Sequence, residues 1–115
     1  MKYMQNGSVG DITSGHQQRF GVTIVEVNDS YVEFADSTGT HFVAPAREFQ
    51  GFDFSSYSTP LTPKFAPGVT IQNAVLVTPP PPLGVITGFS PLGFEYEDSS
   101  GHAHVTINTG ICKIL

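Results

Sequence analysis

Two histidines near the C-terminus have the spacing of a metal-ligand pair. His102 and His104 stand two residues apart in a strand-like segment, and Glu95 and Glu97 precede them on the strand before. Because side chains alternate along a strand, each pair lies on one face. If the intervening turn has four residues, the pairs oppose each other and could hold zinc or another divalent ion. Such an ion would bind a ligand or activate water for hydrolysis.

A solvent-facing hairpin explains the same four residues without a metal, since opposite charges across it would contribute about 0.2–1 kcal/mol for each pair. A three-residue turn would instead set Tyr96 opposite His104 and Asp98 opposite His102, with polar and apolar side chains mixed on each face. The four-residue turn is preferred because it separates the two kinds of side chain, and burial of one face fixes strand register.

This segment repeats an earlier one. EFADSTGTHF, which begins at Glu33, returns 62 positions later as EYEDSSGHAH, which begins at Glu95. Both contain an Asp-Ser-x-Gly turn, which is typical of a hairpin between apolar runs. Upstream, GVTIVEV from Gly21 corresponds to GVITGF from Gly84 if one residue is gapped. The pattern predicts two similar β-meanders, and it leaves open whether the repeat is a duplication or a reuse of turn chemistry.

Short apolar runs alternate with Gly and Pro turns along the chain, and none has a helical period over about ten residues. The segment APAREFQ, with Pro45 near its start, allows one or two helical turns. We therefore predict an all-β fold, a single small barrel or sandwich of about seven to eight short antiparallel strands. The spacing Val-x-Phe-x-Asp-x-x-Gly at 32–39 is similar to that of small SH3-like barrels and identifies no family. The expected strands are 20–27, 31–35, 40–44, 69–77, 84–89, 94–97, 102–108 and 111–115.

A length of 115 residues suits a single domain, 1–115, with its own core. The first meander is expected at about 19–45, a connecting loop at 46–68 and the second half at about 69–115. The two meanders are joined by a Pro-rich segment. Its four consecutive prolines at 79–82 predict an extended polyproline II spacer.

The charge balance excludes several classes of partner. The net charge is −5, and the five Lys and Arg residues are spread without a cluster, so no basic face for nucleic acid can form. No apolar run is long enough for a membrane-spanning helix, and no membrane partner is expected.

The single cysteine, Cys112, and an N-terminus unlike a signal peptide favour a cytoplasmic location. Cys112 itself is expected to be a small buried hydrophobe in the last strand.

Other catalytic patterns are missing from the sequence. No serine lies in a Gly-x-Ser-x-Gly turn, and no glycine-rich segment has the lysine of a phosphate-binding loop. We therefore expect a binding protein rather than an enzyme, with no cofactor unless the histidine pair holds a divalent metal.

Aromatic residues gather in the middle of the chain, where charge is scarce. A large apolar and uncharged surface is usually covered by a partner, and symmetric self-association is the commonest way to cover it. The prediction is a binding or assembly module that forms a homo-oligomer, binds a protein or holds a small apolar ligand. An accessory protein of a phage or another mobile element is a further alternative. The residues expected at this surface are Phe49, Phe52, Phe54, Tyr57 and Phe65.

Overall fold

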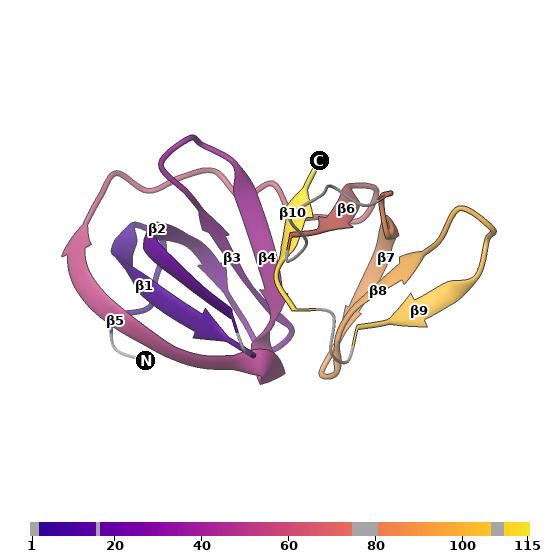
Figure 1. The fold of residues 1–115 in the computed structure, drawn as a ribbon, viewed down its shortest axis with the longest axis horizontal. Helices are drawn as coiled ribbons and strands as arrows, with labels where there is room; N and C mark the ends of the chain where they lie inside the picture. Colours follow the sequence, from indigo (N-terminus) through magenta and orange to yellow (C-terminus); the bar gives the residue numbers. More distant parts are fainter. Residues whose placement is uncertain (1–2, 16, 75–80, 107–109) are drawn as a thin grey trace.

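All the strands of the protein belong to one antiparallel sheet. The computed structural model describes residues 3–15, 17–74, 81–106 and 110–115, which form ten strands and one short 3-10 helix (Figure 1). The prediction of an all-β fold is confirmed. The elements are β1 (Ser8–Ser14), β2 (Gln17–Val27), β3 (Tyr31–Ala35), β4 (His41–Pro45), η1 (Ala46–Glu48), β5 (Phe49–Tyr57), β6 (Thr70–Asn73), β7 (Gly84–Ser90), β8 (Gly93–Glu97), β9 (Ala103–Val105) and β10 (Cys112–Ile114).

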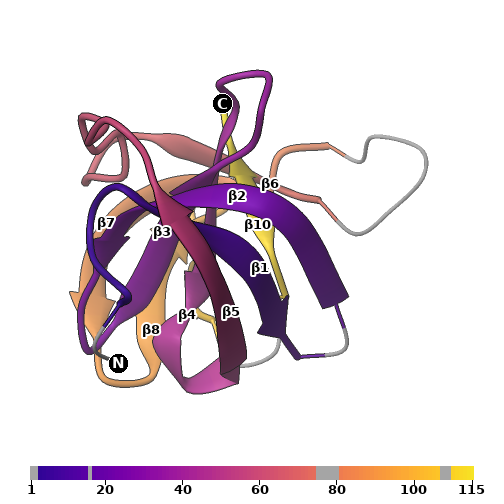
Figure 2. The same cartoon turned by 90° about the vertical axis from the view of Figure 1, so that its left-hand side faces the viewer.

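The sheet does not close on itself. Its strand order is β5-β1-β2-β3-β4-β10-β6-β7-β8-β9, so among the described residues β5 pairs only with β1 and β9 only with β8. The prediction of a small barrel or sandwich of about seven to eight strands is therefore wrong in two respects, because the ten strands form one sheet and this sheet is not closed into a barrel. Figure 1 shows the two free edges at opposite ends of the molecule, whose longest extent is 42 Å. Figure 2 views it from one of these ends, with β5 and β1 in front.

The two strands that sequence reasoning missed pair with each other. β1 has the sequence SVGDITS, in which glycine and polar residues hide the alternation, and β5 lies inside the segment 46–68 that was predicted to be a loop. Phe49–Tyr57 is extended because its backbone bonds to β1 along nearly its whole length. The single turn η1 follows Pro45, as predicted. Of the four prolines at 79–82, the first two lie outside the described residues.

The strand order of the second half repeats that of the first. β5-β1-β2-β3-β4 has its counterpart in β10-β6-β7-β8-β9, and the halves meet where β4 pairs with β10. β3 and β8 begin 62 positions apart. The register between β2 and β3 shifts after Ile24, and that between β7 and β8 shifts after Ile86, again 62 positions later. The upstream part of the repeat therefore needs no gap, contrary to expectation.

The two halves also exchange core residues. One apolar cluster lies mainly in the first half around Ile24 and Phe34, and it includes Ile111 from the segment before β10. The other lies mainly in the second half around Phe94, and it includes Tyr31 from β3. This exchange buries the junction between the halves on both sides. Cys112 is fully buried in β10, as predicted. Among the described residues no helix is long and apolar enough to cross a membrane.

Candidate functional site

The four residues predicted as metal ligands do not share one face of the β8–β9 hairpin. Tyr96, rather than Glu95, lies opposite His104, so the predicted register is wrong by one residue. Because neighbouring side chains on a strand point to opposite faces, Glu95 and Glu97 lie on the face away from His104. In the described part of the chain no group of three or more His, Cys, Asp or Glu side chains is placed to hold a metal ion.

Asp98 sets this register by closing the turn one residue early. Its carboxylate accepts hydrogen bonds from the N–H groups of Ser100 and His102, each at 2.9 Å. Its own N–H donates to the carbonyl of His102 at 2.9 Å, and Gly101 takes the positive φ of 84° that the turn requires. All three residues of β9 are exposed, so no buried face opposes this register.

Both histidines lie close to the Asp98 carboxylate within the hairpin. Nε2 of His104 lies 2.7 Å from Oδ2 of Asp98, and Nδ1 of His102 lies 3.8 Å from the same oxygen. The hydrogen bond from His104, followed by that from the His102 N–H, lowers the pKa of Asp98 to about 2. The ring of His104 also stacks on Tyr96 with centroids 5.1 Å apart. These contacts give both histidines a structural role at the turn.

The five predicted interface residues lie in two different environments. Phe65 is only 4% exposed and packs edge-on against Tyr31 and Phe94 in the core, so it is not part of a surface. The other four are on the edge strand β5, where the three phenylalanines are partly buried and the tyrosine is exposed. They are Phe49, Phe52, Phe54 and Tyr57.

Three aromatic rings form an exposed cluster beside this edge. Phe54 stacks on Tyr3 at 4.5 Å between centroids and contacts Tyr57 at 4.8 Å. Tyr3 is 42% exposed and Tyr57 is 56% exposed. The cluster therefore places apolar ring surface in solvent next to the unpaired backbone of β5.

The opposite edge, β9, also presents free backbone groups. On the side of β8, the carbonyl of His102 accepts the N–H of Asp98 at 2.9 Å, and the N–H of Thr106 donates to the carbonyl of Phe94 at 3.0 Å. In an antiparallel pair the residues between such positions direct their backbone groups away from the partner strand. Ala103 and Val105 therefore direct their N–H and C=O groups toward the open side of β9. A partner strand can bind there through main-chain hydrogen bonds.

Sequence reasoning missed a buried carboxylate–imidazole pair in the first half. Glu33 is fully buried, His41 is 6% exposed, and their Oε2 and Nδ1 atoms are 2.7 Å apart. Glu33 also accepts the backbone N–H groups of Lys64 at 2.9 Å and of Phe65 at 3.2 Å. The pair thus ties the loop after β5 to β3. The one available signal was the position of Glu33 within YVEFA, a short strand with apolar residues on both faces.

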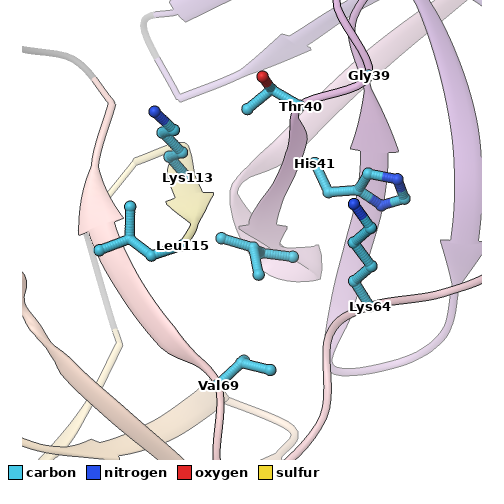
Figure 3. A pocket seen from close by; sticks show the side chains of 8 residues that line it. Gly39, Thr40, His41, Lys64, Val69, Lys113 and Leu115 are labelled. Atoms are coloured by element: carbon cyan, nitrogen blue, oxygen red, sulfur yellow. The ribbon is translucent and has the colours of Figure 1, made fainter.

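A pocket of about 660 Å³ opens beside His41. Figure 3 shows Lys64 next to the His41 ring and Lys113 on the other side, near Thr40. Neither lysine forms an ion pair with a carboxylate of the described residues. Two ammonium groups and an imidazole suit a small anion. Thr40 adds a hydroxyl group to this lining.

In the described part of the chain the arrangement is thus one sheet with two like halves, an edge strand at each end, and the cationic pocket lined by Lys64, Lys113 and His41. No protein-family model, curated protein or solved structure matches this chain.

Proposed function

We propose that this protein is a non-enzymatic assembly module that self-associates through the free edges of its sheet. The observation that carries the proposal is the junction between β4 and β10, where the edge strands of two like halves already pair within one chain. β9 is the counterpart of β4, and β5 is the counterpart of β10. β4 and β10 pair with each other in the centre of the sheet, whereas their counterparts β9 and β5 are the edge strands at its two ends.

The exposure of both edges supports the proposal. Edge strands that remain single are usually protected by charge, proline or a covering segment, because unpaired backbone groups recruit other strands. β9 has three exposed residues and no proline, and Val105 is 42% exposed. Beside β5, the aromatic cluster of Tyr3, Phe54 and Tyr57 adds apolar surface that a partner would cover. A homo-oligomer without a nucleic-acid or membrane partner, located in the cytoplasm, is part of this proposal.

A proline at Val105 tests the proposal. Val105→Pro removes one backbone donor on the open side of β9 while sparing the hydrogen bonds to β8, whereas Val105→Ala shortens the side chain and keeps that donor. We expect the wild type and Val105→Ala to form oligomers in native mass spectrometry and sedimentation velocity. Val105→Pro should shift the distribution to monomer at the same concentration.

Circular dichroism and thermal melting of both variants provide the folding control, since edge positions tolerate proline. A wild type that stays monomeric at about 200 µM, far above the micromolar range of weak specific association, would contradict the proposal. So would a folded Val105→Pro variant that assembles like the wild type.

A further inference from the structure

We infer that copies of this chain assemble head to tail, with β5 of one copy pairing antiparallel with β9 of the next. The inference rests on the proposed self-association and adds which edges meet and in which register. It follows from transferring the internal β4–β10 pairing to the two free edges.

The strand pairs allow the halves to be aligned residue by residue. The register shift after Ile86 lies 62 positions beyond the shift after Ile24. Thr23 on β2 therefore corresponds to Val85 on β7. Val9 pairs with Thr23, and Thr70 pairs with Val85. Val9 and Thr70 are therefore equivalent, as are the residues that follow each of them.

The same step aligns the outer strands. Gly10 pairs with Phe54 of β5, and its equivalent Ile71 pairs with Ile114 of β10. Phe54 and Ile114 are thus equivalent positions. Both pairings continue without interruption over the two preceding residues, so 52 and 53 in β5 correspond to 112 and 113 in β10.

The junction within the chain then supplies the register. Cys112 pairs with Val43, and Lys113 pairs with Phe42. The equivalents of the two β4 residues, 62 positions later, are residues 105 and 104 of β9. A copy that docks β5 onto β9 as β10 docks onto β4 places 52 opposite 105 and 53 opposite 104.

The residues brought together by this register are complementary. Phe52, which is half-buried, meets Val105, which is 42% exposed, and their contact would remove apolar surface from water. Asp53 is exposed and lies opposite His104, whose side chain is 44% exposed. Nε2 of His104 already bonds to Asp98, so its Nδ1 can donate to the Asp53 carboxylate when the ring is protonated, and the two groups then also form an ion pair.

The placement of the edges decides the kind of assembly. β5 and β9 lie at opposite ends of the long axis (Figure 1), so the surface used on one copy differs from that used on the next. Contacts of this type continue into a ring or a filament. Pairing of β9 with β9, or of β5 with β5, would stop at a dimer.

A charge-exchange cycle tests the register. His104→Glu sets a carboxylate against Asp53 and should weaken association about two- to fivefold for each interface. Adding Asp53→Lys creates a Lys–Glu pair at the same place and should restore association at least to the wild-type value. His104→Glu is present in both the single and the double variant, so any effect that it has on the β8–β9 hairpin cancels when their association is compared. Association is measured by sedimentation velocity at neutral pH and low salt.

The matched control moves the same charge elsewhere. Asp29 is exposed in the turn between β2 and β3, so Asp29→Lys combined with His104→Glu has the same net charge and should not restore association. The head-to-tail register is supported if Asp53→Lys restores the association of His104→Glu and Asp29→Lys does not, and if species larger than a dimer form. Independent effects of the two edge substitutions, or a limiting dimer, would overturn the register while self-association stands. A wild type that never associates would overturn the proposed function together with the register.

Discussion

At the scale of single residues, Glu33 has the most demanding environment among the acidic side chains of the described chain. Both of its oxygens are engaged, by the ring of His41 and by two backbone N–H groups of the loop after β5. The cost of burying a charge is offset only when such partners are present. The same contacts hold Lys64 at the rim of the cationic pocket.

Replacement of Glu33 by Gln should destabilise the protein by about 2 kcal/mol, because the amide keeps one acceptor oxygen whereas both carboxyl oxygens of Glu33 are engaged. The repeat offers a control in Glu95, its equivalent 62 positions later, which is half-exposed. Glu95→Gln should change the free energy of unfolding by less than about 0.5 kcal/mol. Urea unfolding measures both, and equal effects would contradict the role assigned to Glu33. Hydrogen exchange should also show faster exchange at the N–H groups of Lys64 and Phe65 in Glu33→Gln.

At the scale of elements, the same hairpin turn is built twice. Asp36 accepts the N–H groups of Thr38 and Thr40, as Asp98 accepts those of Ser100 and His102. Slight burial raises the pKa of Asp36, but the hydrogen bond from the Thr38 hydroxyl, together with those from the two N–H groups, outweighs that effect, and the pKa is lowered. A carboxylate that caps a turn in this way fixes the register of the two strands that leave it.

The turn of the second hairpin should depend on pH in a defined window. The pKa of Asp98 is lowered from 3.8 to about 2, so the ionised form stabilises the folded hairpin. Its contribution is fully present above pH 3.8 and is lost as the pH falls through about 2. The carboxyl carbon shift of Asp98, followed by NMR in acid, should titrate near 2. A midpoint near 4 would show that the hydrogen bonds from His104 and His102 are not made.

At the scale of the whole molecule, the exchange of core residues makes the two halves interdependent. Ile111 of the second half is fully buried in the cluster of the first, and Tyr31 of the first half packs in the cluster of the second. Each half loses part of its core if the other unfolds. This interlocking, and not only the short pairing of β4 with β10, makes the junction stable.

The protein should therefore unfold in a single cooperative transition. Ile111→Ala should lower the free energy of unfolding by about 2–5 kcal/mol. The loss of stability should appear in both halves of the sheet. Calorimetry tests the first statement, and hydrogen exchange of β3 and β8 in the variant tests the second. Two separate transitions, or a loss of protection confined to one half, would contradict the interlocking.

Local chemistry in the sequence determined the β-class of the fold and several elements. The bounds of β3 are as predicted, the turn at Pro45 is present, and Cys112 is buried in the last strand. These features depend on alternation, turn residues and proline geometry within a few positions, so a single sequence contains them. The 62-residue repeat likewise predicts two similar β-meanders.

Only the tertiary structure decided which strands meet and which side chains are buried. β5 reads as a loop because its extended form depends on β1, some forty residues away in the chain. The prediction of a four-residue turn depends on burial of one strand face, yet β9 is exposed on both faces and the Asp98 carboxylate sets the register. Glu33 is buried by a distant loop, and the free edges exist because the sheet stays open. Each of these depends on contacts between residues far apart in the chain, which local patterns do not encode.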